Sequence, residues 1–388
     1  MKKRMKSAVS VIAFFAVCAA LPLLLCGCTG YGTELSQSMI IQGMAVDYHN
    51  GVYTVTVEML NNLQSGSVSA ESASSEKSKI FSSDGKTVSE AVRNIADKCG
   101  KMPLYAHNRV IILGAENLIC GVSDALDFFE RDYDTKPAAL VCAAKGCTAG
   151  ELLRADTGKD TVKSEVLEAV LTRGSENSRV VRVRVLDAVN AVIDEAASLA
   201  LPAVTLEKNG DAESFLLDGT AVFDRNEKFA FFMGKDESAG LVYLKDKIKK
   251  GSIEAQMPDG EAVSFLIVSA KTHYDLLFDG DTPVFKVKVG ISADLNEIGG
   301  VSFTSLDKSD LKNAAQAAAL TVENEMSMCF ALLNEKNCDA ADLSKRLKVF
   351  EPELYAAFTR LDQTVVTRCR LLPEVTVTVH RVGDESFS

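Results

Sequence analysis

The segment that decides the fold is MIIQGMAVDYHNGVYTVTVEM, residues 39–59. In its second half the odd positions from Tyr53 to Met59 are apolar, and the even positions between them are Thr or Glu. This period of two is typical of a strand with one buried face. Asn50 and Gly51 favour a tight turn, because both tolerate a positive φ angle. The segment is therefore predicted to fold as a β-hairpin.

A serine-rich stretch follows the hairpin. Residues 61–78 contain seven Ser and almost no bulky side chain. Such a stretch buries too little apolar surface to offset the entropy lost on ordering, so we expect a mobile loop there. Beyond it, apolar residues recur with helical spacing over 87–99. Thr87 with Glu90 forms a capping box, and Gly100 ends the predicted amphipathic helix.

Strands and helices alternate after this helix. The pattern predicts a strand at 109–113, a helix at 123–131, a buried strand at 138–144 and a short helix at 151–154. This alternation makes residues 79–155 an α/β block. The following residues are mixed in pattern, and Leu201-Pro202 indicates a boundary.

Strands dominate the second half of the chain. The pattern predicts a hairpin with strands at 220–223 and 229–232, and further strands at 262–271, 284–291 and 375–380. A long helix over 311–333 and a shorter one over 342–349 lie among them. Strands that bracket helices suggest an antiparallel sheet covered on one face. The fold class is therefore α+β.

The N-terminus has the three parts of a secretory signal, which are a basic head, an apolar stretch over 8–25 and small residues at the cut. The sequence Leu25-Cys26-Gly27-Cys28 matches a bacterial lipobox. It predicts cleavage between Gly27 and Cys28 and a diacylglyceryl group on the Cys28 thiol, which anchors the chain stably because it carries two acyl chains. The alternative is an uncleaved signal anchor.

Composition excludes several classes of protein. The chain has 388 residues, with 42 Lys and Arg against 53 Asp and Glu, so its formal net charge is −11. Removing residues 1–27 also removes four positive charges, which gives −11 − 4 = −15. An acidic chain does not suit nucleic-acid binding, which requires a basic surface. The apolar stretch at the N-terminus is the single candidate for a membrane span, so a multi-span transporter or channel is excluded.

No catalytic motif stands out. The sequence contains no GxSxG, HExxH or GxxxxGK[ST] pattern, and its four histidines are His49, His107, His273 and His380. His49 lies in a predicted turn and is expected to be solvated. His107 precedes an apolar strand, and a buried imidazole bonded to the backbone is favoured there over a ligand or catalytic role. We therefore assign no catalytic, cofactor-binding or metal-binding residue and expect no enzyme.

Three other clusters have ordinary interpretations. The acidic residues Asp124, Asp127, Glu130, Asp132 and Asp134 could hold a cation, but a solvated helix face is favoured. The basic run at 245–250 is expected to end a helix or strand. Seven cysteines remain beyond the lipobox, and most are expected to be small buried thiols: Cys99, Cys120, Cys142, Cys147, Cys329, Cys338 and Cys369. Cys142 and Cys147 could approach each other, which leaves a disulfide open.

Four groups of segments, in this order behind a lipobox, resemble the C-subunit lipoproteins of bacterial spore germinant receptors, the Ger(x)C family. The first is Cys28 with Glu34-Leu35, IIQGMAVD at 40–47 and YTVTVE at 53–58. The second is GKTVSEA at 85–91, YAHNRVIILG at 105–114 and LDFFERD at 126–132. The third is DGTAVF at 218–223 with Gly240-Leu241, and the fourth is FKVKV at 285–289 with the 311–333 helix.

The resemblance implies a non-enzymatic protein with three mixed α/β domains outside the membrane. We place these at 28–200, 201–282 and 283–383, after a signal peptide at 1–27. It also implies partners, an A-type multi-span subunit and a B-type transporter-like subunit, and attachment to the outer face of the cytoplasmic membrane, which is the inner membrane of the spore. Only the lipid site Cys28 is assigned.

Two other functions remain open at this stage. A solute-binding lipoprotein of an ABC transporter shares the lipobox and the size, but needs two similar α/β lobes around a ligand cleft. An extracellular hydrolase is disfavoured by the scarcity of His and by the missing motifs.

Overall fold

The computed structural model describes residues 38–61, 77–114, 121–131, 136–158, 161–194, 196–210, 212–299, 307–360, 364–382 and 385–386. The chain divides into two compact units, residues 1–38 and 39–388, and apart from Ser38 the elements below lie in the second. The predicted signal peptide, Gly27 and Cys28 lie outside the described residues, as does nearly all of the loop expected at 61–78.

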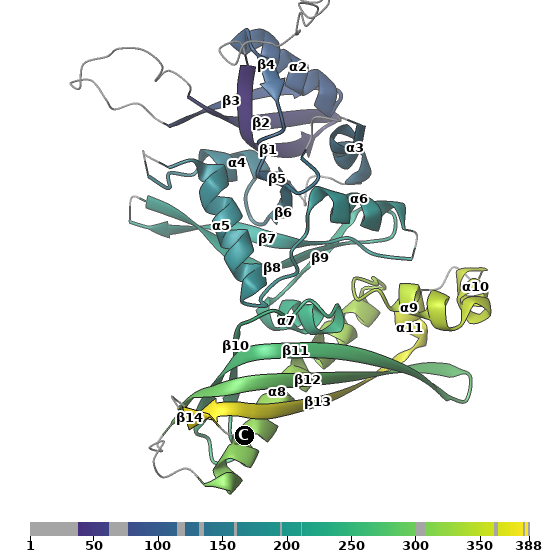
Figure 1. Ribbon diagram of the computed structural model, residues 1–388. Coiled ribbons are helices and arrows are strands. Elements are labelled where there is room, and N and C mark those ends of the chain that lie inside the picture. Colours follow the sequence, from purple (N-terminus) through teal and green to yellow (C-terminus); the bar gives the residue numbers. More distant parts are fainter. Residues whose placement is uncertain are drawn as a thin grey trace, which may run out of the picture. The chain divides into compact units, whose positions relative to one another are not determined.

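Nine strands of the described chain form the first sheet (Figure 1). Its order is β3-β2-β1-β5-β6-β7-β8-β9, and β4 pairs with β1. The bounds are β1 Ser38–His49, β2 Val52–Leu60, β3 Ser78–Gly85, β4 Met102–Leu104, β5 Val110–Leu113, β6 Leu140–Ala144, β7 Ala200–Asn209, β8 Ala212–Phe223 and β9 Phe229–Met233. Strands β1, β5, β6 and β7 pair in parallel, and antiparallel strands extend the sheet at both ends. The hairpin predicted over 39–59 is confirmed, but the prediction that its second strand buries one face only is wrong, because Thr56 and Glu58 on the other face are also fully buried.

Helices cover both faces of this sheet. They are α2 Val88–Cys99, α3 Ser123–Arg131, α4 Ala149–Arg154, α5 Lys163–Glu176 and α6 Val185–Ile193. Ile111 and Leu113 of β5 pack in the cluster that includes α2, α3 and α6, whereas Val110 and Ile112 pack in the cluster that includes α4 and α5. All four are fully buried, as a strand covered on both faces requires. The predicted α/β block is confirmed.

Helix α2 begins and ends where predicted, but one hydrogen bond of the expected capping box differs. The Thr87 side chain accepts a hydrogen bond from the Glu90 backbone N–H, and Gly100 takes a left-handed conformation with φ 62°. The Glu90 carboxylate, however, accepts from the backbone N–H of Lys86 rather than from that of Thr87. The reciprocal half of the expected capping box is therefore displaced by one residue.

The second sheet contains five strands of the described chain, in the order β10-β11-β12-β13-β14. Their bounds are β10 Ser252–Gln256, β11 Ala262–Asp279, β12 Thr282–Ile298, β13 Arg370–Val382 and β14 Glu385–Ser386. Phe285, Val287 and Val289 alternate along β12 and are buried. Helix α8, Lys308–Glu335, packs against this sheet and lies across one of its faces (Figure 1). The predicted long helix is thus confirmed.

Shorter helices connect these parts. Helix α7, Lys235–Leu244, packs against both β8 and α8, and so joins the first sheet to the second. Three short helices follow α8 and precede β13 along the chain: α9 Leu343–Phe350, α10 Pro352–Arg360 and α11 Val365–Arg368. Among the described helices, none combines the length with the apolar character that crossing a bilayer requires.

One strand departs from the predicted sheet. The antiparallel arrangement is confirmed for β10, β11 and β12, but β13 pairs in parallel with β12, so the prediction is wrong there. Parallel neighbours need a crossover connection, and helices α8 to α11 provide it in the described chain. The second sheet is therefore mixed, within the α+β class.

The sheets also run through the predicted domain boundaries. Strand β7 begins at Ala200 and pairs with β6 on one side and β8 on the other, so the first sheet continues past residue 201. The β11–β12 hairpin spans residues 282 and 283 in the same way. The division into 28–200, 201–282 and 283–383 stays a prediction.

Candidate functional site

The four histidines are exposed and lie on separate elements. His49 is the last residue of β1, directly before the turn at Asn50-Gly51, and the Nδ1 atom of His380 lies 3.1 Å from the Asp294 carboxylate. The prediction of a buried imidazole at His107 is wrong, because this side chain is exposed. The next residue, Asn108, is fully buried instead. Within the described ranges, no group of three or more His, Cys, Asp or Glu side chains could hold a metal ion.

The described residues of the acidic cluster make separate contacts with different partners. Asp124 accepts a hydrogen bond from the Tyr53 hydroxyl at 3.3 Å, and Asp127 pairs with Arg131 at 2.6 Å on the exposed face of α3. Asp132 and Asp134 lie outside the described residues. The favoured interpretation as a solvated helix face is confirmed for Asp127.

None of the described cysteines is in a disulfide. Cys142, Cys329, Cys338 and Cys369 are buried, and Cys99 and Cys147 are half-buried. Burial raises the pKa of the Cys338 thiol to about 11, which keeps it protonated. The prediction of buried thiols is confirmed for the four buried cysteines but not for Cys99 and Cys147, and Cys142 and Cys147 form no disulfide. Cys120 lies outside the described residues.

Two buried carboxylates that the sequence analysis did not single out hold helix ends. Asp47, at the end of the IIQGMAVD segment, accepts hydrogen bonds from the backbone N–H groups of Ala149 and Gly150, both at 2.8 Å. These N–H groups belong to the first turn of α4, where an anion is stabilising. Burial raises the pKa of Asp47, although the two backbone hydrogen bonds act in the opposite direction.

Glu58 does the same for α5. It is fully buried and accepts hydrogen bonds from the backbone N–H groups of Lys163 at 2.8 Å and Ser164 at 2.7 Å. The hydroxyl groups of Ser78 and Ser164 also donate to it. A Cβ atom at Gly43 would lie 1.9 Å from the Ser164 Oγ atom, so glycine is required beside this cap. The polar motif residues of β1 and β2 thus position helices rather than form a reaction centre.

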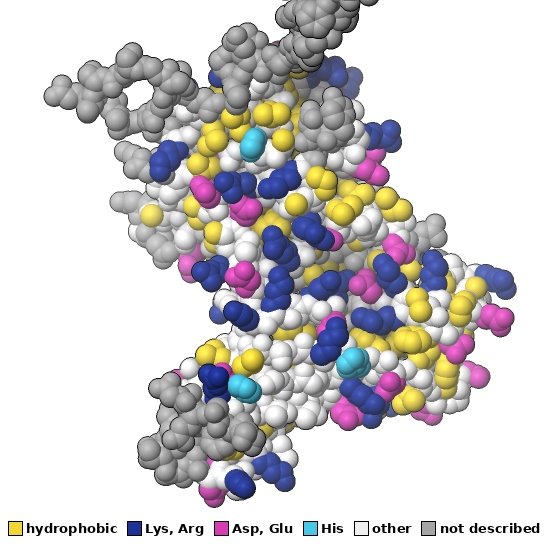
Figure 2. All heavy atoms as spheres, viewed as in Figure 1, with side chains coloured by type: hydrophobic (Ala, Val, Ile, Leu, Met, Phe, Trp, Pro, Cys, Tyr) yellow, Lys and Arg dark blue, Asp and Glu magenta, His cyan; other side chains and the backbone are white. Residues whose placement is uncertain are grey.

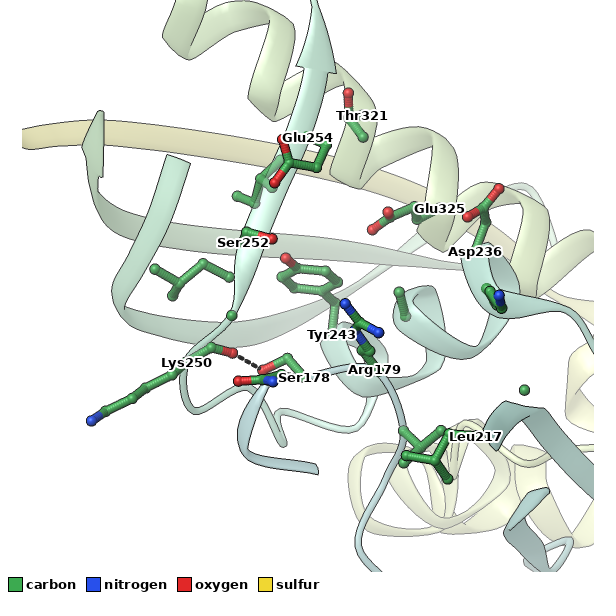
Figure 3. Close-up of a pocket in the computed structure, with 18 of the residues that line it drawn as sticks. Ser178, Arg179, Leu217, Asp236, Tyr243, Lys250, Ser252, Glu254, Thr321 and Glu325 are labelled. Carbon is green, nitrogen blue, oxygen red and sulfur yellow. Dashed lines mark hydrogen bonds between the residues drawn. The ribbon is translucent and has the colours of Figure 1, made fainter. Parts of the chain in front are cut away.

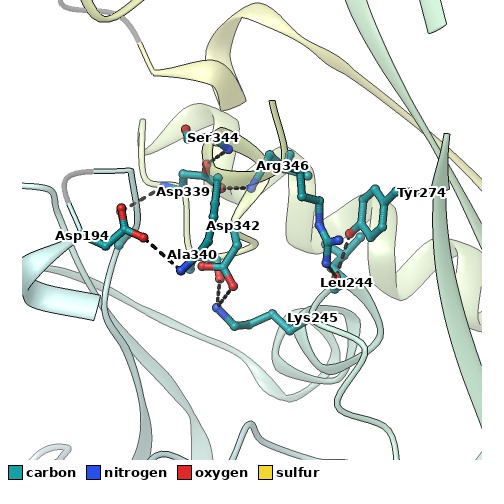
Figure 4. Close-up of polar contacts among 12 residues, drawn as sticks. Asp194, Leu244, Lys245, Tyr274, Asp339, Ala340, Asp342, Ser344 and Arg346 are labelled. Carbon is teal, nitrogen blue, oxygen red and sulfur yellow. Dashed lines mark hydrogen bonds and ion pairs between the residues drawn. The ribbon is translucent and has the colours of Figure 1, made fainter. Parts of the chain in front are cut away.

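A third buried carboxylate belongs to the network that fixes α9 (Figure 4). Asp339 accepts from the backbone N–H groups of Leu343 at 3.0 Å and Ser344 at 2.5 Å, and burial raises its pKa. Its own backbone N–H donates to the Ser198 hydroxyl at 3.0 Å. The connection between α8 and α9 is therefore bonded directly to the segment that precedes β7.

The basic run at 245–250 begins in the same network. Helix α7 ends at Leu244, so the prediction that this run ends a helix is confirmed. Lys245 is largely buried, with its Nζ atom 2.6 Å from the Asp342 carboxylate and 3.0 Å from the Ala340 carbonyl oxygen. Figure 4 shows Lys245 pointing toward these residues. Lys245 is thus a structural residue that links α7 to α9.

A hollow of about 1080 Å³, which we call the α7–α8 cleft, lies between α7, α8 and their neighbouring elements (Figure 3). Its walls come from the connection between α5 and α6, from β8, α7, β10 and β11, and from α8. The Ser178 hydroxyl donates to the Lys250 carbonyl oxygen at 2.5 Å and closes the rim where the α5–α6 connection meets β10. A Cβ atom at Gly240 would lie 2.2 Å from the Glu325 carbonyl oxygen, so glycine lets α7 approach α8 closely.

Two polar side chains stand out in the α7–α8 cleft. Glu325 of α8 is half-buried, and desolvation together with the nearby Asp236 carboxylate raises its pKa to about 7. Tyr243 of α7 is 4% exposed, and burial raises the pKa of its hydroxyl above the usual range. Sequence periodicity could not find this pair, because the two residues are 82 positions apart and meet only through the packing of α7 on α8.

The protein consists of two mixed β-sheets with packed helices. Buried carboxylates accept the backbone N–H groups at the starts of three of these helices. Comparisons give its family. Residues 32–206 match the "Spore germination protein N-terminal domain", and residues 218–383 match "Spore germination B3/ GerAC like, C-terminal". The chain belongs to this family of spore germination proteins, the Ger(x)C family.

Curated relatives and a solved structure agree. The chain is 25% identical over 348 residues to spore germination protein B3 of Bacillus subtilis (strain 168), covering 88% of this chain and 90% of that one. It is 23% identical over 326 residues to spore germination protein KC of the same strain, covering 79% and 80%. The crystal structure of the GerBC protein has the same fold, with a TM-score of 0.57, 21% identity, and coverage of 88% of this chain and 97% of that one.

Proposed function

We propose that this protein is a membrane-tethered, non-catalytic subunit of a spore germinant receptor. The lipid on Cys28 holds it on the outer face of the cytoplasmic membrane, the inner membrane of the spore. There it acts through contacts with the A-type and B-type multi-span subunits. The observation that carries this proposal is the lipobox, Leu25 to Cys28, placed four residues before the family match begins at residue 32.

The tether has a physical purpose in this proposal. After cleavage the chain would carry a net charge of −15, from −11 minus the four positive charges of the signal, so anionic headgroups would repel it. A lipid anchor overcomes this repulsion and confines the protein to the plane of the membrane. Confinement raises the effective concentration of the partners, so weak contacts suffice.

Exposed apolar side chains support a role through protein contacts. Val349 is 75% exposed and Phe350 is 49% exposed at the end of α9, and α10 has no buried residue. Figure 2 shows hydrophobic side chains gathered over α9 and α10. Clustered apolar side chains on a surface are typical of contact sites, and we assign this one to the multi-span subunits.

The ABC-transporter alternative finds no support in the architecture. A solute-binding protein of that kind needs two similar α/β lobes. Here a sheet with a parallel centre, antiparallel strands at both ends and helices on both faces is joined to a second mixed sheet with a long helix on one face. These two halves are built differently.

The test is the substitution Cys28→Ala, with Cys26→Ala as the matched control in the same segment. The proposal predicts that C28A leaves the membrane fraction and that spores carrying it germinate poorly in nutrient, whereas C26A behaves as the unaltered protein. Membrane fractionation and germination kinetics measure both effects. A C28A protein that stays with membranes and supports germination would contradict the proposal.

A further inference from the structure

Another hollow of the described chain has walls rich in basic side chains, and we call it the basic hollow. It has a volume of about 500 Å³ and lies where the α5–α6 connection, α6 and the start of β7 meet the segment that follows α7. Five cationic residues line it: Arg182, Arg184, Lys245, Lys247 and Lys249. Figure 2 shows Lys and Arg side chains gathered over the region between α6 and α7. The chain as a whole is acidic, with a net charge of −11, so this part differs in sign from the rest.

Acidic partners neutralise two of these five residues. The Arg184 guanidinium donates to both carboxylate oxygens of Asp187, at 2.8 and 3.0 Å, and Lys245 pairs with Asp342 as described above. Asp187 is the acidic residue in the wall, and its pKa is lowered chiefly by Arg184 and further by Lys247.

The other three cations have no such partner. The side chains of Arg182, Lys247 and Lys249 are exposed and form no ion pair or hydrogen bond within the described part of the chain. No further acidic side chain lines the basic hollow among the described residues, so these three positive charges are left unbalanced.

The backbone fixes the position of the arginines. Val and Arg alternate along 181–185, and the valines are buried, so Arg182 and Arg184 point to the opposite side. The Val183 carbonyl oxygen accepts from the Val141 backbone N–H of β6 at 2.9 Å, which holds this segment beside the first sheet. The arginines are therefore presented by a backbone that is already in place.

The lysines are held in the same way. The Lys247 backbone N–H donates to the Val242 carbonyl oxygen at 3.0 Å, and that of Lys249 donates to the Ser178 hydroxyl at 3.1 Å. The fold therefore keeps like charges close together, and their mutual repulsion is unfavourable until an anion binds between them.

We propose that the basic hollow binds a small organic polyanion, a molecule with two or more carboxylate or phosphate groups. Arg182 would bind one such group through its planar guanidinium, and Lys247 and Lys249 would bind another. The carbon skeleton would lie against the apolar part of the wall, which includes Val181, Val183, Ala191, Leu199 and Ala200. The volume of about 500 Å³ is within the usual range for small-molecule sites.

Larger anions fit less well. A membrane surface or a nucleic acid is an extended polyanion, and the net charge of −11 on the chain opposes its approach. A small ligand inside the hollow is affected mainly by the cations around it, because salt screens exposed charges beyond about 8 Å. The α7–α8 cleft has charges of both signs in its walls, among them Asp236, Glu325, Arg179 and Lys235, and so indicates no ligand charge.

The test is calorimetric titration of the purified protein in non-ionic detergent at low salt. The probes are propane-1,2,3-tricarboxylate, fructose 1,6-bisphosphate and the uncharged propane-1,2,3-tricarboxamide. We expect at least one of the two polyanions to bind with a dissociation constant below about 1 mM, and the amide not to bind. Which polyanion binds more tightly shows whether the site prefers carboxylate or phosphate. Raising the NaCl concentration to about 0.5 M should weaken binding about tenfold or more.

Substitutions separate the hollow from the overall charge of the chain. The double substitution K247Q/K249Q should weaken binding about tenfold or more, and Arg182→Gln should weaken it severalfold, while Arg182→Lys should retain part of it. The double substitution K308Q/K312Q is the matched control. It removes two exposed lysines at the start of α8 and changes the net charge equally, so this protein should bind as the unaltered one does. Circular dichroism checks that each variant is folded.

Four results would overturn the proposal. Neither polyanion binds at millimolar concentration, folded K247Q/K249Q binds as tightly as the unaltered protein, or K308Q/K312Q weakens binding to the same extent. The fourth is binding to phosphatidylglycerol vesicles that K247Q/K249Q abolishes, without binding of either small polyanion, which would assign these cations to the membrane surface instead.

Discussion

At the scale of single residues, this protein uses buried carboxylates as fixed acceptors for helix ends. Glu58 receives two backbone N–H groups from α5 and two hydroxyl groups, all within a fully buried site. An ionised carboxylate satisfies all four donors, because it offers two oxygens with no proton of its own. A neutral amide would place an NH₂ group against donors.

Glu58→Gln should therefore lower the free energy of unfolding by roughly 2–3 kcal/mol, the usual effect of weakening charge-assisted hydrogen bonds in a buried site. Glu90→Gln is the control, since Glu90 accepts the Lys86 backbone N–H at an exposed site. Its effect should stay below about 1 kcal/mol. Urea denaturation measures both, and equal effects of the two substitutions would contradict the assigned role of Glu58.

Substitution of Glu325 should change the free energy of unfolding in the opposite direction. Its pKa is raised to about 7 from an ordinary 4.5, so the folded state holds this proton more tightly than the unfolded chain does. Stability from this group is therefore fully present below about pH 4.5 and is lost as the pH rises toward 7. Glu325→Gln should raise the free energy of unfolding at pH 8 by up to about 3 kcal/mol and change it little at pH 4.

Denaturation of E325Q and the unaltered protein at both pH values measures this difference directly. Because Asp47 and Asp339 also have raised pKa values, the comparison between the two proteins, and not the pH profile of either alone, isolates Glu325. A gain that is the same at pH 4 and pH 8 would contradict the assignment.

At the scale of elements, the close contact of α7 with α8 depends on Gly240. A Cβ atom there would lie 2.2 Å from the backbone oxygen and 2.6 Å from the backbone carbon of Glu325, atoms that cannot move without displacing α8. Gly240→Ala should therefore lower the free energy of unfolding by roughly 2–3 kcal/mol, as overpacking a tight contact does.

Gly290 provides the matched control for that substitution. It lies in β12, and a Cβ atom there would meet nothing within 4 Å. Gly290→Ala should change the free energy of unfolding by less than about 1 kcal/mol. If thermal or urea denaturation shows that G240A is as stable as G290A, the helices are farther apart than described.

Elements with a clear period were predictable from the sequence, and those without one were not. The β1–β2 hairpin, α2 and α8 each have one apolar face, so their period identified them. Helix α7 has a continuous buried run from Gly240 to Leu244, which leaves no alternation to detect. The parallel pairing of β13 with β12 depends on a crossover that includes, among the described residues, helices α8 to α11, and local periodicity carries no information about it.

At the scale of the whole molecule, the sequence predicted a lipid site but not the polar contacts that tertiary packing makes within the body. The lipobox is contiguous, so Gly27 and Cys28 could be named from a short segment. Glu325 and Tyr243 are brought together by tertiary packing, and each looks ordinary in its own helix. The same reason explains why Asp47 and Glu58 were quoted as motif residues but not recognised as caps, since α4 and α5 lie about a hundred positions away.

The central claim is that a lipid on one thiol holds this body at the membrane. Mass spectrometry of the N-terminal peptide, taken from protein purified from its native membrane, tests it most directly. The account predicts a peptide that begins at Cys28 and carries the added mass of a diacylglyceryl group. A peptide that still contains residues 1–27, or an unmodified Cys28, would contradict it.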